Sequence, residues 1–386
     1  MTAQVFPFPA NWRTPVSERL EWLTDVLEHR DASEQRVQLR QNCRQVIEYD
    51  FAAFTEHMPL LQSLLYGHQG QTWIVPLWFN QQALTEDITN GTQIPCVTEG
   101  YQFQAGAHVI LYASATNFEY GTIHAVQENR VVLKNNLNSS WSAGTLIIPA
   151  YAGYSTDPIT TTFANHNIAT GVIRFYSESF IAPQVTLSLF DSYPVLDILP
   201  NRSQDMTEVW TRALEHLDNG VGQSYLFDLV SSTKSAMSYH FTLLDRLKIN
   251  NYRNILYYLK GRLKPIWIPT GNQDMYLAEP IVTGLSTLTI NYCAYTSQVF
   301  GKPTRQHLRI QTPERVFYRR IVAAVENVGT QRETLTLNEA LDTTVGIEHV
   351  FISFLCLRRL DSDSVELSWV NPTLMETNVV FKEVAA

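Results

Sequence analysis

The sequence predicts a mainly β protein with a few helices, built from two related β-rich units. Aromatic residues are abundant, with 8 Trp, 18 Tyr and 18 Phe among 386 residues, and such side chains pack well on pleated sheets. Short apolar segments recur at roughly ten-residue spacing between turn-forming Asn, Ser and Gly residues. A repeated order of segments along the chain indicates that one structural plan occurs twice.

The clearest repeat links GQTWIVPLW, which begins at Gly70, with GRLKPIWIPT, which begins at Gly261, 191 residues later. The other matched segments are Phe8–Asn11 with Leu199–Asn201, Leu27–His29 with Leu214–His216, Glu48–Phe51 with Ser238–Phe241, Leu64–Tyr66 with Ile255–Tyr257, Ile123–Val126 with Val322–Val325, Val131–Leu133 with Leu335–Leu337, and a weaker Gly171–Phe175 with Ser364–Ser368. Small insertions in turns explain why the offset between matched segments drifts. We interpret the pattern as an internal duplication, with copies at residues 1–183 and 184–386.

Each copy begins with an extended, Pro-marked segment, and the next segment fits two structures. Ser17–His29 has apolar residues at helical spacing and could form an amphipathic helix. In the second copy, however, Thr207–Leu217 runs into Asp218-Asn219-Gly220, and Asn-Gly favours a tight hairpin turn. We therefore predict a β-hairpin in both copies.

A strand with two apolar residues on one face follows, at Tyr49 and Phe51 in the first copy. The next predicted element is a helix, over Pro59–Tyr66 in the first copy and Leu243–Lys260 in the second. Gly70 and Gly261 then stand where a helix end favours the left-handed conformation.

The Trp-bearing segment after each glycine is predicted to be a buried strand, and its Pro to stop further pairing. The motif therefore indicates packing and not catalysis. The remainder of each copy is predicted to form a small barrel or sandwich of short strands. These strands are expected at residues 107–112, 122–126, 130–133 and 144–149 in the first copy, and at 307–311, 316–325, 334–337 and 349–357 in the second.

Composition narrows the function classes. A net charge of −9 gives no basic surface for DNA or RNA. No signal peptide and no apolar run of roughly 20 residues are present, so we expect a soluble protein without a membrane span. The cysteines, Cys43, Cys96, Cys293 and Cys356, form no CxxC pattern and are predicted to be buried free thiols.

No motif predicts an active site. The ten histidines form no HExxH pair, and Gly220-Val221-Gly222 fits a turn better than a dinucleotide loop. Asp361 and Asp363 are the closest carboxylate pair and are predicted to lie in a solvated loop. Five tryptophans that could stack on sugars, but whose strand contexts favour the core, are Trp73, Trp78, Trp141, Trp210 and Trp267. We predict no catalytic residue, no cofactor, no metal site and no enzymatic activity.

Four segments resemble a family of tail-tip proteins of long-tailed bacteriophages and prophages. They are NWRTPVSERLEWLTDVLEHRDASEQR (residues 11–36), QTWIVPLW (71–78), SWSAGTLIIPA (140–150) and YYLKGRLKPIWIPTGNQDMYL (257–277). The chain departs from the family at Asp31-Ala32-Ser33, where a Gly is usual in the turn, and at Cys43, where a Pro often occurs. The first hairpin is therefore expected to differ in shape.

The resemblance implies a structural protein of the virion tail, assembled in the cytoplasm of the bacterial host. Its partners would be tail tube, hub, tape-measure and fibre proteins, and two similar units suit a homo-oligomeric ring, as a trimer or hexamer. Two alternatives stay open. The chain could be a receptor- or glycan-binding module at the tail tip, or, less favoured, a glycan hydrolase.

Overall fold

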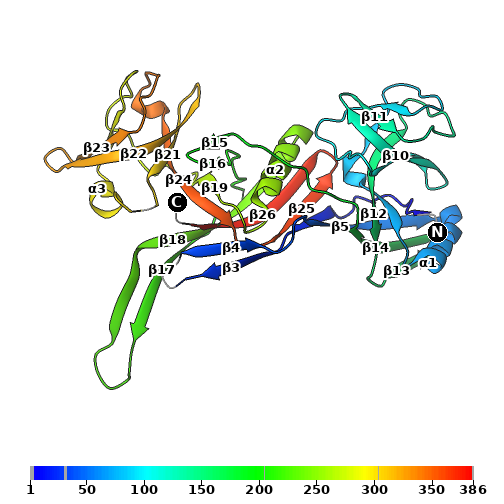
Figure 1. Ribbon diagram of the computed structural model, residues 1–386, viewed down its shortest axis with the longest axis horizontal. Coiled ribbons are helices and arrows are strands. Elements are labelled where there is room, and N and C mark those ends of the chain that lie inside the picture. The colour runs from blue at the N-terminus through cyan, green and yellow to red at the C-terminus, as the bar shows by residue number, and fades with distance from the viewer. Residues whose placement is uncertain (1–3, 30–32, 204, 303, 385–386) are drawn as a thin grey trace.

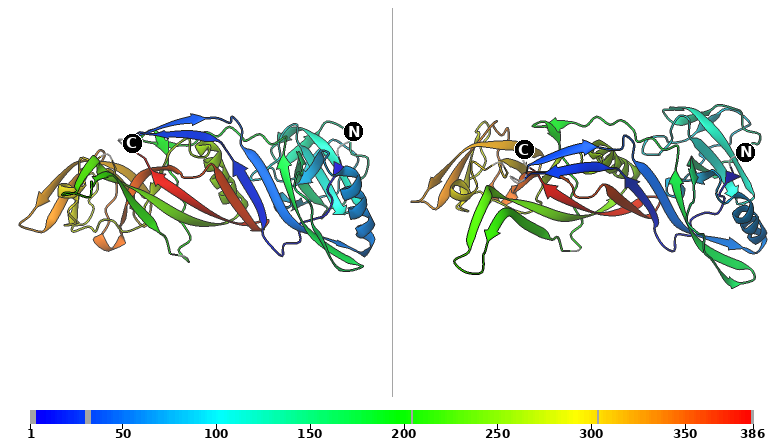
Figure 2. Two further views of the ribbon diagram at one scale, coloured as in Figure 1. Left: turned by 90° about the horizontal axis from the view of Figure 1, so that it is seen from below. Right: turned by 60° about the horizontal axis from the view of Figure 1, so that its bottom comes forward.

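Strands dominate the structure, a computed structural model that describes residues 4–29, 33–203, 205–302 and 304–384 (Figure 1). These residues form 26 strands, but only three α-helices and three short 3-10 helices. The prediction of a mainly β fold with few helices is therefore confirmed. Figure 2 shows that the molecule is elongated, with helix α1 (Met58–His68) and the red C-terminal strands in different parts of its length.

The described residues of the first half, residues 1–183, form one α-helix. Its elements are β1 (Gln4–Val5), β2 (Val16–Glu21), β3 (Thr24–Glu28), β4 (Glu34–Gln38), β5 (Arg44–Phe54), η1 (Thr55–His57), α1 (Met58–His68), β6 (Trp73–Pro76), η2 (Trp78–Asn80), β7 (Gln82–Ala83), β8 (Gln93–Pro95), β9 (His108–Ser114), β10 (Asn117–Gln127), β11 (Arg130–Leu133), β12 (Leu146–Tyr154), β13 (Thr161–Asn165) and β14 (Ile168–Ser177). The four strands predicted between residues 107 and 149 correspond to β9 to β12, apart from their ends.

The second half, residues 184–386, forms two α-helices in its described part. Its elements are β15 (Leu189–Phe190), β16 (Tyr193–Pro194), β17 (Glu208–Leu217), β18 (Tyr225–Leu244), α2 (Arg246–Leu259), β19 (Ile266–Pro269), β20 (Thr287–Asn291), α3 (Tyr295–Gln298), β21 (His307–Gln311), β22 (Val316–Asn327), β23 (Arg332–Leu337), η3 (Ile347–His349), β24 (Phe351–Leu360), β25 (Ser364–Asn371) and β26 (Leu374–Glu383). The four strands predicted between residues 307 and 357 correspond to β21 to β24.

One antiparallel sheet, the main sheet, runs through both halves. Its strands lie in the order β17, β18, β26, β25, β2, β5, β14, β13. The strand β2 belongs to the first half and β25 to the second, so backbone hydrogen bonds join the halves. Alternation sets which residues face the core: in β2, Val16, Glu18 and Leu20 are buried and the residues between them are half-buried. A single apolar core with residues from both halves lies against this sheet.

Each half also carries a small antiparallel β-unit beside the main sheet. In the first half β8, β10, β11 and part of β9 enclose an apolar cluster that includes Ile123 and Leu133. In the second half β20, β22, β23 and part of β21 enclose a cluster that includes Ile321 and Leu337. A small β portion in each half was predicted from the short strands.

The two halves have the same order of strand pairings. The series β8–β11–β10–β9–β12–β14–β5 in the first half corresponds to β20–β23–β22–β21–β24–β26–β18 in the second. An irregularity in the register even recurs between Ile123 and Ala125 in β10 and between Ile321 and Ala323 in β22. A shared plan is thus observed, whereas its origin in a duplication stays a hypothesis.

The segments before each hairpin also correspond. Asn11 N–H donates to the carbonyl of Asp50 at 2.9 Å, and Asn201 N–H donates to the carbonyl of His240 at 2.7 Å. Each asparagine side chain then accepts a hydrogen bond from the backbone two residues later, at 2.9 Å in both halves. Asn11 and Asn201 therefore begin the hairpins with the same local turn.

Helices α1 and α2 each end shortly before a glycine, as predicted. Gly70 follows α1 with a φ of 88°, and Gly261 follows α2 with a φ of 68°. The strands that come next, β6 and β19, are buried at every residue. The helix, the glycine and the buried strand therefore form one structural unit in each half.

The two tryptophans of the repeat are not equivalent, which corrects their alignment. Pro76 and Pro269 end the corresponding strands, so Trp73 corresponds to Ile266 and Trp267 to Ile74. Successive strand residues face opposite sides of a sheet, so the two Trp rings face opposite sides. Trp73 lies in the main core, whereas Trp267 packs in a separate cluster with Leu355 and Leu357.

Three other segments of the first half were also matched to the wrong residues of the second half. The corrected correspondences are Leu27 with Leu217, Ile123 with Ile321 and Gly171 with Thr377. For example, Gly171 and Thr377 face Phe51 and Phe241 across the sheet, so residues 171–175 correspond to part of β26 and not to 364–368 in β25. Apolar strand segments look alike in several registers, and the hydrogen-bond ladder selects one of them.

The hairpin predictions are confirmed in both halves, because β2–β5 and β17–β18 are antiparallel pairs. The prediction of a tight turn at Asn219-Gly220 is wrong. Residues 218–224 instead form a longer loop, in which Gly220 has a φ of 70°. In the first half, Asp31 and Ala32 of the unusual turn lie outside the described residues.

Candidate assembly interface

Candidate metal-ligating side chains are dispersed in the part of the chain that the structure describes. Within the described residues, no group of three or more His, Cys, Asp or Glu side chains lies together as a metal site requires. No helix in that part of the chain is long and apolar enough to cross a membrane. Cys43, Cys96 and Cys356 are buried free thiols, but Cys293 is exposed in the loop before α3, which corrects its prediction. Its Sγ donates to Glu333 at 3.3 Å.

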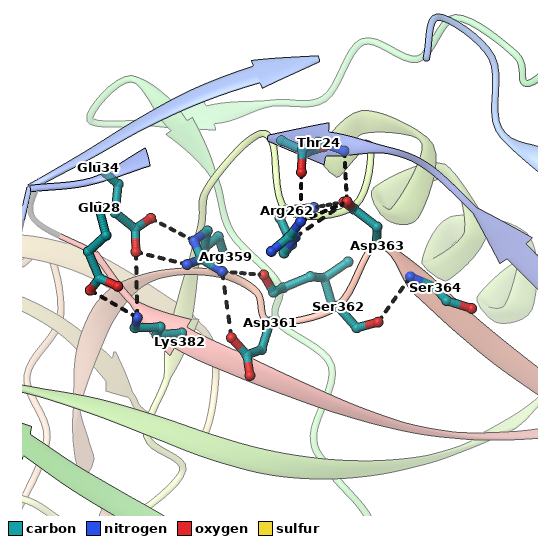
Figure 3. Close-up of polar contacts among 11 residues, drawn as sticks. Thr24, Glu28, Glu34, Arg262, Arg359, Asp361, Ser362, Asp363, Ser364 and Lys382 are labelled. Carbon is teal, nitrogen blue, oxygen red and sulfur yellow. Dashed lines mark hydrogen bonds and ion pairs between the residues drawn. The ribbon is translucent and has the colours of Figure 1, made fainter. Parts of the chain in front are cut away.

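Asp363 is a structural residue, which corrects the prediction of a solvated loop. Its side chain is 14% exposed, and its carboxylate accepts hydrogen bonds from the backbone N–H of Thr24 at 2.7 Å and of Arg262 at 2.9 Å (Figure 3). Asp361, by contrast, is 53% exposed and lies 3.7 Å from Arg359. Asp363 thus ties the first half's hairpin to the turn after α2.

The two halves meet at a strand pairing, which we call the junction. Here β2 pairs antiparallel with β25, from Val16 opposite Trp369 to Glu21 opposite Ser364. On its other edge β2 pairs with β5, so neither edge of β2 is open to another strand. Leu20 and Trp369 are fully buried there.

A buried ion pair lies beneath the junction. Glu18 of β2 pairs with Arg253 of α2, and its carboxylate also accepts hydrogen bonds from Trp369 Nε1 at 3.0 Å and from Gln45 Nε2 at 2.7 Å. Burial disfavours the charge on Arg253, but the adjacent Glu18 carboxylate and Tyr257 hydroxyl together outweigh it and raise the pKa of Arg253 above its usual value. A buried charge pair with this many partners fixes the orientation of β2 against α2.

Trp369 connects the junction to the rest of the first half. Its ring stacks on Phe79, with centroids 4.6 Å apart and planes 20° apart. The guanidinium carbon of Arg246 lies 5.2 Å from the Trp369 ring and 4.9 Å from the Tyr101 ring. Burial lowers the pKa of Arg246 to about 10. Aromatic and cationic side chains from both halves therefore share one buried contact.

The end of the first hairpin, described at residues 24–29 and 33–38, packs on the second half; we call it the first arm. Arg359 donates two hydrogen bonds to the carboxylate of Glu34, at 2.7 and 2.8 Å, and Lys382 lies 3.2 Å from Glu28 (Figure 3). The side chains of Glu34 and Arg359 are 3% and 4% exposed. Burial opposes ionisation of Glu34, yet Arg359 holds the pKa of this carboxyl below its usual value. The first arm is therefore bound by charges.

The end of the second hairpin, residues 214–228, is the second arm, and it projects from the body (Figure 1). Its exposed large apolar side chains are Leu214, Leu217, Val221, Tyr225, Leu226 and Phe227. Because neighbouring strand residues such as Leu226 and Phe227 face opposite sides, both faces of the arm are apolar. Exposed apolar surface of this kind is typical of sites that bind a partner.

Four of the five tryptophans predicted to be core are buried, namely Trp73, Trp78, Trp141 and Trp267. Trp210 is 57% exposed, and this prediction is wrong. It lies in β17, the outermost strand at one end of the main sheet, with its ring 5.3 Å from the guanidinium carbon of Arg305. An edge position explains how a strand residue of core type remains uncovered.

A groove of about 1060 Å³ opens in the second half. Among the described residues that line it are Arg202, Gln273, Tyr276, Asn291, Glu348 and His349. Glu348 is the one carboxylate of that lining, whereas most glycoside hydrolases use two. The groove therefore offers polar and aromatic groups for binding, without a carboxylate pair.

The charged residues of the junction were not singled out from the sequence, although a signal for them exists. Glu18 occupies a core position of the alternating VSERLE segment, and Arg359 follows the apolar run FISFLCL. A charged residue at a core position is almost always paired. The partners could not be found, because Arg253 and Glu34 lie hundreds of residues away from Glu18 and Arg359.

The chain matches no model of a known protein family, and no curated protein is significantly similar to it in sequence.

Proposed function

We propose that the chain is a structural subunit of the tail tip of a long-tailed bacteriophage. It acts as an adaptor that joins tail tube, hub, tape-measure and fibre proteins, and it is carried in the virion after assembly in the host cytoplasm. The resemblance of residues 11–36, 71–78, 140–150 and 257–277 supports this family. The geometry supports a role in assembly.

The observation that carries this proposal is the second arm. An apolar hairpin that projects from a folded body is costly to leave in water, and it is a usual feature of proteins that assemble with partners. The elongated body places such binding surfaces far apart, as an adaptor requires (Figure 2). The fully paired junction also gives the two halves a fixed relation, so that the chain can act as a rigid spacer.

Purified particles test the proposal. Mass spectrometry of gradient-purified virions should detect the chain in a fixed copy number relative to the tail-tube protein. Immunogold electron microscopy should place it at the distal end of the tail. Absence of the chain from particles, or labelling of the capsid instead of the tail tip, would contradict the proposal.

A second candidate function is binding of a receptor or glycan. The groove in the second half favours it, because Tyr276 is 63% exposed at its edge and Gln273 and Asn291 offer amide groups to sugar hydroxyls. Glycan-array binding that is lost in Tyr276→Ala would support this function. The hydrolase alternative stays less favoured, since the groove supplies one carboxylate.

A further inference from the structure

The two ends of the main sheet are open. Among the described residues, β17 pairs only with β18, and β13 pairs only with β14. We infer that these ends bind each other in different copies of the chain, β17 of one copy pairing antiparallel with β13 of the next and repeating the junction. The inference rests on the proposed assembly role and names one partner, a second copy of this chain.

The shared plan identifies which strands correspond to the junction strands. In the first hairpin Glu21 faces Arg44, and in the second Thr211 faces Lys234, each 190 residues later. The open strand β17 therefore corresponds to β2. In the same way Phe163 faces Ala169 and Trp369 faces Met375, each 206 residues later, so β13 corresponds to β25.

Corresponding residues differ strongly in exposure. Leu20 is fully buried by the junction, whereas the corresponding Trp210 is 57% exposed. Trp369 is likewise fully buried, and the corresponding Phe163 is 52% exposed. Large apolar side chains thus stand uncovered at both open ends, in the positions that the junction covers.

The helix beside the junction shows the same difference. Leu64 and Ile255 correspond, and both are 9% exposed. Two residues further, Tyr257 of α2 is 6% exposed at the junction, whereas Tyr66 of α1 is 97% exposed at the open end. The helices therefore bury the same inner face, and only the face toward the missing neighbour differs.

Transfer of the junction register gives the expected contacts between copies. The facing pairs would be Met206 with Phe163, Thr207 with Thr162, Glu208 with Thr161 and Trp210 with Ile159 of the next copy. No pair brings like charges together, and Trp210 meets an apolar residue, as Leu20 meets Val365 at the junction. A strand added to an open edge in this way is a common mode of protein recognition.

Each arm also matches the chemical character of the surface that it contacts or would contact. At the junction the ladder pair Arg359 and Lys382 meets the acidic residues of the first arm. The corresponding ladder pair of the first half is Tyr154 and Tyr176, whose rings are stacked with centroids 5.7 Å apart. An aromatic surface thus replaces the charges where the apolar second arm would bind.

The contact between copies is heterologous, because it joins different surfaces of the two chains. Such contacts close into a ring or extend into a filament, depending on the rotation between neighbours. In a ring of three copies, six similar units would alternate between junctions within a chain and contacts between chains.

Disulfide cross-linking tests the register directly. Two single variants, Thr207→Cys and Thr162→Cys, are made in a Cys293→Ser background and mixed. We expect a cross-linked dimer in the mixture and none with either variant alone. The double variant Ser17→Cys, Ser368→Cys is the matched control, since these residues face each other within one chain and should form an internal disulfide.

Sedimentation of the full chain tests the same contact without cysteines. Trp210→Asp and Phe163→Asp should each weaken concentration-dependent association at least tenfold, because each places a charge in the contact. Val328→Asp, in the exposed turn between β22 and β23, should leave association unchanged. A chain that stays monomeric, with no mixed dimer while the Ser17–Ser368 control forms its disulfide, would overturn the inference.

The outcomes separate the two proposals. A chain that is found in tail tips but makes no mixed dimer would retain the adaptor function and lose the self-contact. A chain that makes the mixed dimer but is absent from virions would retain the self-contact and lose the adaptor function.

Discussion

Gly261 and Gly70 hold corresponding places after the two helices, but their surroundings differ. A Cβ at Gly261 would lie 2.3 Å from Asp363 Oδ1 and 3.0 Å from Trp22 Cβ. Nothing lies within 4 Å of a Cβ at Gly70. Both glycines have positive φ, so the difference comes from the close approach of the chain at the junction.

This difference predicts unequal costs for two matched substitutions. Gly70→Ala should lower the free energy of unfolding by about 1 kcal/mol, the cost of a positive φ for a residue with a Cβ. Gly261→Ala should lower it by about 3 kcal/mol, because Asp363 must also move. Urea unfolding of both variants measures this, and equal losses would show that the junction does not press on Gly261.

Glu18 is predicted to be the most sensitive charged residue of the junction. Glu18→Gln leaves Arg253 buried without its counter-charge, which should cost about 3 to 5 kcal/mol of unfolding free energy. Glu279→Gln breaks the ion pair with Arg332, whose side chains are about half exposed, and should change stability by less than about 0.5 kcal/mol. A similar loss in both variants would contradict the proposed role of Glu18.

Glu34 predicts how the first arm responds to pH. Its folded pKa lies below the unfolded value of 4.5, so its contribution is full above pH 4.5 and is lost as the pH falls through the folded pKa. Protection factors for hydrogen exchange in residues 24–29 and 33–38, which correct for the slower intrinsic exchange in acid, should therefore fall in that acidic range. In Glu34→Gln these protection factors should already be lower at neutral pH and change less with acidification; an identical acid response in both proteins would contradict this.

At the scale of elements, local patterns predicted much of the fold. Helix spacing with a terminal glycine located α1 and α2, and short apolar segments between turn residues located β9 to β12 and β21 to β24. Registers were harder, because a strand shifted by one residue keeps a similar apolar pattern while its side chains change face. Trp73 and Trp267 show the result, since their motifs look alike but the rings face opposite sides.

The junction could not be predicted from local patterns. Val16 pairs with Trp369 near the other end of the chain, and nothing in either segment names its partner. Trp210 was predicted to be buried for a related reason: its strand context is that of a core residue, but no further strand covers β17 among the described residues. Whether a strand lies at an edge depends on the whole topology.

The two arms predict opposite effects of shortening. Replacement of residues 214–228 by a short turn should change the unfolding free energy by less than about 1 kcal/mol, since the second arm is exposed, but should abolish self-association. Replacement of residues 24–38 should cost about 3 kcal/mol, because it removes the buried ion pair between Glu34 and Arg359. Thermal unfolding and sedimentation of both variants measure the two effects. A large loss of stability on shortening the second arm would contradict the view that this arm contributes little to the packing of its own chain.

At the scale of the whole molecule, the chain has two unlike ends joined by one sheet. One end presents β17 and the apolar second arm, and the other presents β13, Phe163 and Tyr66. A molecule with such ends can add copies in one direction without changing its own fold. The junction within the chain would then be one of two kinds of similar contact in the assembly.

The most direct measurement is electron cryomicroscopy of purified tail tips, or of the assembled chain, at a resolution that shows strands. The account predicts β17 of each copy hydrogen-bonded to β13 of its neighbour, with Trp210 and Phe163 buried as Leu20 and Trp369 are within the chain. A map in which β17 and β13 face solvent, or pair with different proteins, would contradict it.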